Sequence, residues 1–305
     1  MDRSRWIGTG MALLAAALFG ASFPLSKPLL RHSSAAGLAG LFYIGCGLGS
    51  AVLLLGRRLR GTSYASSPLR RADLKWLTGS ILSGGVAGPM FLLHGLERTP
   101  AHVAAFLTNA ETLFTVLLAV IFFGDRLSRR EGFGTLVILV GATLVALGGV
   151  EAKGAFAWQG PLLLLGAGLG WGFDNNFTQR ISGRDPLQIA VVKGFAAGTV
   201  NLTLAFSTGA PPPLAPGFLA GALAIGFSCY GLSLATFVIG LRHLGAARTS
   251  ALFATNPAMA ALLSWALLAE IPRPITALGG LLMIPGAWLL LRPAAPSPEE
   301  TGKSG

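Results

Sequence analysis

Charged residues are scarce in this chain. Only 11% of its 305 residues are Asp, Glu, Lys or Arg, whereas a soluble globular domain uses about a quarter of its residues for these types. Apolar residues make up 52% of the chain, and the mean hydropathy is +0.65. This composition excludes an ordinary soluble domain and predicts a membrane protein whose solvent is the lipid bilayer.

Cysteine and several catalytic motifs are also scarce or missing. Cys46 and Cys229 lie in apolar stretches without metal-ligand spacing, so we expect buried thiols, no disulfide framework and no metal site. The formal charge of +11 sits in short basic clusters between apolar runs, which argues against nucleic acid as a partner. Neither GxxxxGK[ST] nor HExxH occurs, so direct ATP drive, a cofactor and an enzymatic activity are not expected.

Ten apolar runs have about the 20-residue length that a helix needs to cross about 30 Å of hydrocarbon. Their approximate limits are 7–27, 35–56, 74–95, 101–124, 132–149, 158–178, 187–208, 217–240, 247–269 and 275–291. The alternating strands of about ten residues that build a membrane barrel are absent. We therefore predict an all-α integral membrane protein with ten transmembrane helices. The basic and apolar opening resembles a signal peptide, but the apolar run continues to Leu30, so a retained first span is predicted.

The distribution of basic residues predicts the orientation. If all ten runs cross the membrane, seventeen of the 23 Lys and Arg residues fall on the side of the N-terminus. The opposite side holds Lys27, Arg31, Arg98, Lys153 and Arg273, and Lys193 lies within a span. Because Lys and Arg favour cytoplasmic loops, both termini are predicted to be cytoplasmic, including a tail at 292–305.

The sequence matches itself at a constant offset of 145. GLERTPAHVAAFLTNAETLFTVLLAVIFFGDRL at 95–127 lies over GLRHLGAARTSALFATNPAMAALLSWALLAEIP at 240–272, which aligns Asp125 with Glu270. Each half, 7–149 and 158–291, then contains five predicted spans. Since five is odd, the second half must enter the membrane upside down, as in transporters that are built from inverted repeats around a central substrate site.

Each half also opens with an aromatic residue followed by glycine. LFGASFPLSK at 18–27 lies over GWGFDNNFTQ at 170–179. These openings, the five-plus-five layout and the helix ends FFGDRL and LLAEIP resemble the EamA-type drug/metabolite transporter superfamily over about residues 11–291. The resemblance implies a carrier of the plasma (inner) membrane that exports metabolites or drugs by alternating access.

The fourth and ninth spans carry polar residues at mid-depth. The usual mid-helix proline of the family occurs only as Asn256-Pro257, whereas the first half has Asn109 and Glu111. A buried carboxylate costs about 2.5–3.5 kcal/mol on insertion scales and marks a cavity, an ion pair or a proton relay. Glu111 is therefore a candidate for proton coupling, or else a neutral or paired group that holds helices together. Pro257 predicts an unpaired Phe253 carbonyl, as a ligand contact or a packing kink.

The segment GWGFDNNFTQR at 170–180 carries an acid and two amides in succession, after an apolar run. Helical spacing places four of its side chains on one stripe, namely Trp171, Asp174, Asn175 and Thr178. Asn176 points away from this stripe and is expected to bond to a neighbouring helix. Lys193, in the next span, reaches a depth similar to that of Asp174. The two charges could pair structurally, bind a zwitterionic substrate between them, or leave Lys193 to snorkel towards the interface.

The sequence thus predicts a secondary active transporter, most simply an exporter of a small organic metabolite or drug-like compound, coupled to protons. Import, another coupling ion, a membrane receptor or assembly factor, and an intramembrane enzyme are the alternatives. The expected partners are a small-molecule substrate and the lipid bilayer. One carboxylate, several amides and Trp171 are compatible with amino acids, amines and aromatic compounds alike, and the sequence does not indicate an oligomeric state.

Overall fold

The protein is helical throughout the part of the chain that the structure describes. This computed structural model describes residues 3–61, 67–123, 129–130, 132–134, 136–137, 140–141, 144, 158–271 and 273–291. Within these residues there is no strand, and the β-type contact is an isolated bridge between Ser67 and Arg184. Most of the predicted span at 132–149, Asp125 and the predicted tail at 292–305 lie outside the described residues.

The first half contains a series of long and short helices. Their bounds are α1 Arg3–Leu30, α2 Ala35–Leu59, the 3₁₀ turn η1 Arg71–Asp73, α3 Leu74–Ser80, the π-helical segment η2 Ile81–Ala87, α4 Gly88–Glu97, α5 Ala101–Thr108 and α6 Ala110–Phe123. The pieces from η1 to α4 form one continuous rod, because each begins at the residue after the previous one ends.

The second half follows the same plan. Its elements are α8 Gln159–Arg180, α9 Pro186–Ser207, α10 Pro216–Ile225, the π-helical segment η4 Gly226–Leu232, α11 Ser233–Leu244, α12 Ala246–Phe253, α13 Asn256–Leu268 and α14 Pro274–Leu291. Six helices of the described residues are long and apolar enough to cross a membrane: Ser4–Leu30, Ala35–Leu59, Arg71–Glu97, Ala101–Phe122, Pro186–Ser207 and Pro216–Leu244. The chain is therefore a multi-pass membrane protein.

Several helix ends follow from local sequence. The Ser34 hydroxyl accepts a hydrogen bond from the backbone N–H of Gly37 (3.1 Å) and caps α2. Asp185 caps α9 in the same way, and Pro186 occupies the first turn, where no backbone donor is needed. α11 ends at Leu244, and the next residue, Gly245, has a φ of 81°, a conformation that favours glycine.

The irregular elements recur at the offset of the sequence repeat. Adding 145 to the limits of η2 and α5 gives the limits of η4 and α12, and adding 145 to the last residues of α3 and α6 gives those of α10 and α13. The predicted spans 74–95 and 217–240 therefore both contain a π-helical segment, and the predicted spans 101–124 and 247–269 both contain an interruption. Such irregularities in membrane helices tend to occur at functional sites.

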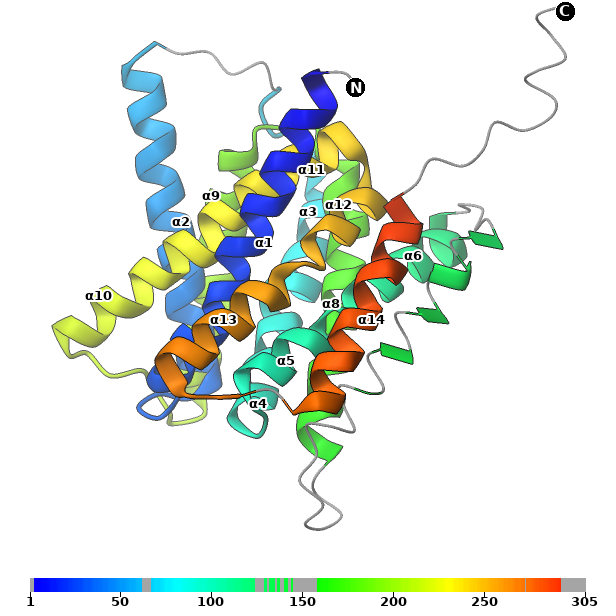
Figure 1. Ribbon diagram of the computed structural model, residues 1–305. Coiled ribbons are helices and arrows are strands. Elements are labelled where there is room, and N and C mark those ends of the chain that lie inside the picture. Colours follow the sequence, from blue (N-terminus) through cyan, green and yellow to red (C-terminus); the bar gives the residue numbers. More distant parts are fainter. Residues whose placement is uncertain are drawn as a thin grey trace, which may run out of the picture.

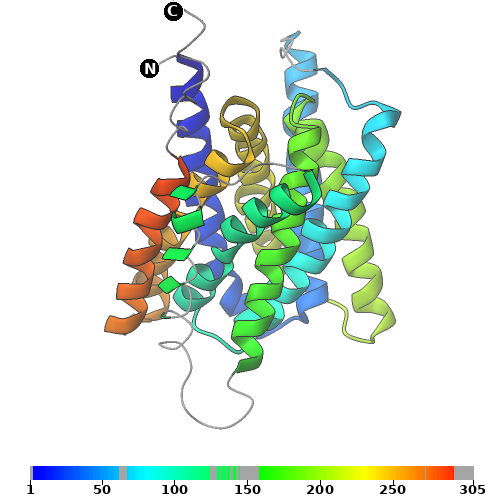
Figure 2. The same cartoon turned by 90° about the vertical axis from the view of Figure 1, so that its right-hand side faces the viewer.

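The two halves interdigitate. α1 packs on α11, α12 and α13 of the second half, while α8 packs on α4, α5 and α6 of the first, and α2 lies against α9 (Figures 1 and 2). α1 runs from the upper to the lower end of the bundle, whereas α8 runs from the lower to the upper end. α1 begins and α14 ends at the same, upper end (Figure 1).

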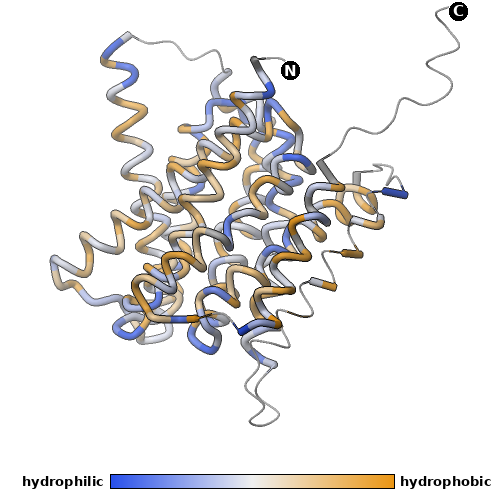
Figure 3. The backbone as a smooth tube through the Cα atoms, viewed as in Figure 1, coloured by the Kyte–Doolittle hydropathy of each residue, from blue (hydrophilic) through white to orange (hydrophobic). Residues whose placement is uncertain are grey.

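Polar and apolar residues are segregated as expected for a bundle in lipid. Figure 3 shows hydrophilic positions mainly at the two ends of the bundle and apolar positions along the helices between them. Large apolar side chains such as Val52, Ile121 and Leu281 are exposed on the outside. The buried core contains aromatic side chains, among them Phe23 and Phe42.

Two of the predicted spans, 101–124 and 247–269, contain a break in the regular helix. In the first, α5 and α6 meet at Asn109 within Ala101–Phe122, which is long and apolar enough to cross a membrane. In the second, residues 254–255 separate α12 from α13. Pro257 lies in the first turn of α13, where it starts a helix instead of kinking one. The Phe253 carbonyl is not unpaired either, because it accepts a hydrogen bond from Nδ2 of Asn256 (3.0 Å).

Candidate functional site

A cavity in the middle of the bundle contains most of the residues predicted to carry transport. The empty space between the residues around it amounts to about 540 Å³, counting the part that is open to the outside. The predicted residues that line it are Glu111, Trp171, Asp174, Asn175 and Lys193. Asn109, Asn256 and Pro257 are not among its lining residues.

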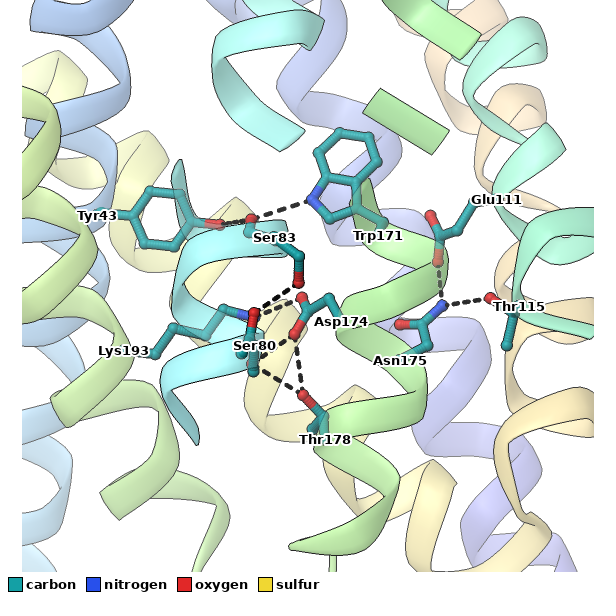
Figure 4. Close-up of polar contacts among 12 residues, drawn as sticks. Tyr43, Ser80, Ser83, Glu111, Thr115, Trp171, Asp174, Asn175, Thr178 and Lys193 are labelled. Carbon is teal, nitrogen blue, oxygen red and sulfur yellow. Dashed lines mark hydrogen bonds and ion pairs between the residues drawn. The ribbon is translucent and has the colours of Figure 1, made fainter. Parts of the chain in front are cut away.

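Lys193 and Asp174 form a direct ion pair between α9 and α8 (Figure 4). The ammonium group of Lys193 also donates to Oγ of Ser80 on α3 (3.1 Å). The hydroxyls of Ser80 and Thr178 donate to the other oxygen of Asp174. Lys193 is only 2% exposed, so it does not snorkel to the interface. The charges of Lys193 and Asp174 therefore compensate each other, and the hydroxyls of Ser80 and Thr178 complete their hydrogen bonds.

The π-helical segment η2 makes room for this pair. A Cβ atom added to Gly84 would lie 2.0 Å from Oδ2 of Asp174, so only glycine permits this approach. The Gly84 carbonyl accepts hydrogen bonds from the Tyr43 hydroxyl (2.6 Å) and from Nε1 of Trp171 (3.2 Å). Ser80, Tyr43 and Gly84 were not predicted from the sequence, because a serine, a tyrosine or a glycine within an apolar run carries no signal of its own.

Glu111 lies in the first turn of α6, just after the interruption at Asn109. Nδ2 of Asn175 donates to Oε1 of Glu111 (2.6 Å) and also contacts the hydroxyls of Thr115 (3.0 Å) and Ser250 (3.3 Å) (Figure 4). Glu111 is 6% exposed, and no ion pair among the described residues includes it. The positive end of the α6 dipole favours its carboxylate by about 0.3–1 kcal/mol.

Asn176 behaves as its position on the helix predicts. Its Nδ2 donates to the Thr115 carbonyl on α6 (3.0 Å) and to the Gly172 carbonyl of its own helix (2.9 Å). Asn176 does not line the cavity. Of the three polar residues in the DNN triplet, Asp174 and Asn175 face the cavity, and Asn176 joins α8 to α6.

Aromatic rings form the apolar wall of the cavity. They are Phe19, Tyr43, Trp171, Tyr230, Phe237 and Phe253. Phe19 and Trp171, the aromatic residues that open the two halves, pack edge to face with ring centroids 5.3 Å apart. Phe19 also contacts Tyr230 (5.8 Å) and Phe253 (5.3 Å). The wall therefore draws on both halves.

The interruption between α5 and α6 contacts the interruption between α12 and α13. Nδ2 of Asn109 donates to the Ala254 carbonyl (2.6 Å), and Nδ2 of Asn256 donates to Oδ1 of Asn109 (3.1 Å). A Cβ atom on Gly20 would lie 2.3 Å from the Asn256 carbonyl, so α1 passes directly over this junction. Asn109 and Asn256 thus position Glu111 and Phe253 at the cavity without lining it themselves.

Ion pairs join the helices at the end of the bundle where α1 ends and α5 begins. Lys27 pairs with Glu270 (2.6 Å), which also contacts Nδ1 of His102 (3.2 Å) and accepts from the Ala101 N–H (2.8 Å). Burial alone would raise the pKa of Glu270, but the hydrogen bonds from His102 and Lys27 and the Lys27 charge lower it to about 2. Glu270 aligns with Asp125 in the sequence repeat, and its partners were not predicted.

The opposite end of the bundle is also held by charged groups. Arg57 at the end of α2 pairs with Asp185 at the start of α9. Arg184 pairs with Asp73 (2.8 Å), and Arg242 donates to the Arg184 carbonyl (2.6 Å). The cavity therefore lies between two sets of polar contacts that connect different crossings.

Comparison with known proteins identifies the family. A family model described as the EamA-like transporter family matches residues 6–147 and 158–292. The chain belongs to the EamA-like transporter family. The resemblance stated from the sequence is thereby confirmed, and the protein is a transporter-family member rather than an enzyme.

Individual relatives of this EamA family member are distant. An uncharacterized transporter of Methanothermobacter thermautotrophicus is 27% identical over 225 residues, which are 73% of this chain and 66% of that protein. A probable terminal-alkyne amino-acid exporter of Streptantibioticus cattleyicolor is 28% identical over 245 residues, 75% of this chain and 79% of that protein. The region of this chain that matches the Methanothermobacter protein thus spans just under two thirds of that protein's length. A solved crystal structure has a TM-score of 0.69 at 17% identity, covers 95% of this chain and 100% of its own, and shares the fold.

The cavity of this EamA protein combines few polar groups with a largely aromatic surface. Among the described residues, no group of three or more His, Cys, Asp or Glu side chains is arranged to hold a metal ion, and both cysteines are free and buried. A carboxylate and an amide within an aromatic wall can orient a small organic molecule and exchange a proton.

Proposed function

We propose that this protein is a secondary active transporter that exports a small organic metabolite or drug-like compound across the plasma (inner) membrane in exchange for protons. The substrate occupies the central cavity, and Glu111 carries the coupled proton. The observation that supports this most directly is the placement of Glu111: a buried carboxylate that lines the cavity, lies next to a helix interruption and has no ion-pair partner among the described residues. The printed name of one relative, a probable exporter, supports the direction.

The proposed architecture consists of ten transmembrane helices in two inverted five-helix repeats, 7–149 and 158–291, with both termini and the tail 292–305 in the cytoplasm. Three observations support it: the recurrence of irregular elements at one offset, the opposite directions of α1 and α8, and the reciprocal packing of each on the other half. In transporters of this type the two repeats rock around a fixed central site.

Alternating access requires that each end of the bundle can open. At one end, opening separates Lys27 from Glu270 and detaches α1 from the region after α13. At the other end, it separates Arg57 from Asp185 and moves α2 relative to α9. We therefore assign these two ion pairs to the closed states of the two ends, with the cavity between them.

Proton coupling is tested with purified protein in liposomes that contain a pH-sensitive dye. A panel of amino acids, amines and aromatic compounds is added outside, and substrate-dependent proton movement is followed. Glu111→Gln should abolish this movement, because the amide cannot release a proton. Glu97→Gln is the matched control, since Glu97 is a partly exposed acid at the end of α4 with no role in the cavity. Unchanged proton movement in Glu111→Gln would contradict the assignment.

A further inference from the structure

The charges that line the cavity do not balance. Among the described lining residues, three are charged: Glu111, Asp174 and Lys193. Lys193 and Asp174 neutralise each other by direct contact, and Ser80 binds both of them. Glu111 remains, and within the described residues the hydrogen bond that it accepts from Asn175 reaches Oε1 alone. The second oxygen of Glu111 is therefore available to a donor on the ligand.

The surroundings of Glu111 suit a positive group. A cation is attracted both to a carboxylate and to the faces of aromatic rings, and the attraction to rings strengthens in a desolvated site. The aromatic wall, with Phe19, Trp171 and Phe253 in mutual contact, lies in the same cavity as Glu111. An ammonium group at Glu111 and a hydrophobic body against the rings would satisfy both features together.

The same surroundings disfavour a carboxylate. Lys193 is the one cationic side chain among the described lining residues, and it is 2% exposed and already held by Asp174 and Ser80. A ligand carboxylate would have to displace Asp174 from Lys193 or lie beside the negative charge of Glu111 without a cationic partner among the described lining residues, even if the Tyr230 hydroxyl donated to it. Burying an unpaired charge is costly. A zwitterionic amino acid therefore brings one group that the cavity accommodates and one that it does not.

We propose that the cavity binds a monovalent organic amine with an aromatic or apolar body, and that it discriminates against the amino acid and the carboxylic acid of the same skeleton. The proposal rests on the proposed function, since it names the substrate class of that transport site. Glu111 binds the ammonium group in its ionised form, so that substrate and proton compete for one carboxylate.

Binding to the full-length protein in lipid nanodiscs tests this charge preference directly. Three probes share an indole skeleton: tryptamine carries one positive charge, tryptophan is zwitterionic, and indole-3-propionate carries one negative charge. Calorimetry at pH 7.5 should give at least tenfold tighter binding for tryptamine than for tryptophan, and no measurable binding for indole-3-propionate. Phenethylamine and phenylalanine form a second matched pair, for which the same order is expected. Tryptophan binding as tightly as tryptamine, or no binding by any probe, would overturn the proposal.

Variants locate the preference at Glu111. Glu111→Gln should weaken tryptamine binding at least tenfold, whereas Glu111→Asp, which keeps the charge, should retain part of the affinity. Glu97→Gln should bind as the wild type does. Amine binding that is unchanged in Glu111→Gln would overturn the assignment of this carboxylate. If Glu111→Gln does not fold, the comparison of the three probes on the wild-type protein still decides the charge preference.

The two proposals fail in different ways. Binding in nanodiscs needs neither a gradient nor transport. Preferential amine binding without movement of amine across liposomes would therefore contradict the transport proposal and leave the cation site intact. Movement of tryptophan in preference to tryptamine would keep the transport function and overturn the cation site.

Discussion

Lys193 carries a full positive charge inside the bundle, and Asp174 is the carboxylate that balances it. Asp174→Asn should leave that charge buried and unpaired, with a loss of about 3–5 kcal/mol in stability. Combining Asp174→Asn with Lys193→Met should recover most of this loss, because the uncompensated charge is gone. The melting temperatures of the three proteins in one detergent, followed by intrinsic fluorescence, measure the effect. A double variant that is less stable than the single one would show that the pair contributes more than charge balance.

Glu270 provides a pH-dependent contact at one end of the bundle. Its pKa is lowered from the ordinary value of 4.5 to about 2 in the folded protein. A carboxylate with a lowered folded pKa stabilises the fold fully above its unfolded pKa and loses this contribution as the pH falls through the folded pKa. Glu270→Gln should therefore lower the melting temperature at pH 7, and the difference from the wild type should shrink between about pH 4.5 and 2. A difference that stays constant over this range would contradict the prediction.

Single residues were predictable where their chemistry is rare in hydrocarbon. Glu111, Asp174 and Lys193 stand out because an ionisable group within an apolar run is costly, and the structure places all three at one cavity. Ser80 was not predictable, although it binds both members of the ion pair. A serine can satisfy its hydroxyl on its own helix, so its presence in an apolar run says nothing about its neighbours.

Helix limits were predictable because the lipid dictates them. The second span was predicted to begin at 35 and α2 begins at Ala35; the last was predicted at 275–291 and α14 is Pro274–Leu291. The interruptions at Asn109 and at 254–255 were not predicted, although polar residues mark both places in the sequence. Both interruptions are held by hydrogen bonds between Asn109 and residues 254 and 256, which are far apart in sequence. Hydropathy cannot detect such contacts.

The junction between α5–α6 and α12–α13 should depend on Asn109 more than on Pro257. Asn109→Leu removes the donor to the Ala254 carbonyl and one of the two acceptors of the Asn256 amide, which keeps its hydrogen bond to the Phe253 carbonyl. An unsatisfied buried polar group costs about 1–3 kcal/mol. Pro257→Ala adds an N–H in the first turn of α13, where no helical acceptor is required, and should cost less than about 1 kcal/mol. Thermal unfolding of the two variants in the same detergent makes the comparison. A larger loss for Pro257→Ala would show that the proline restrains the junction.

The whole molecule should have an even number of crossings, with both termini in the cytoplasm. In a bacterial host, a fluorescent reporter fused after the C-terminus should fold, whereas alkaline phosphatase at that position should be inactive. Alkaline phosphatase inserted after Gly209, between α9 and α10, should be active, because that connection lies at the end opposite to the start of α1. Activity at the C-terminus and inactivity at Gly209 would reverse the proposed orientation.

The interdigitation of the halves also has a consequence for how the protein is made. The main partners of α1 are α11, α12 and α13, so nearly the whole chain must leave the ribosome before α1 reaches its final neighbours. Until then, Gly20 lacks the Asn256 carbonyl that packs against it, and the ring of Phe19 lacks its contacts with Tyr230 and Phe253. A nascent chain that stops after the first half would thus expose the surface of α1 that the second half normally covers. Quality-control proteases can recognise such an uncovered surface.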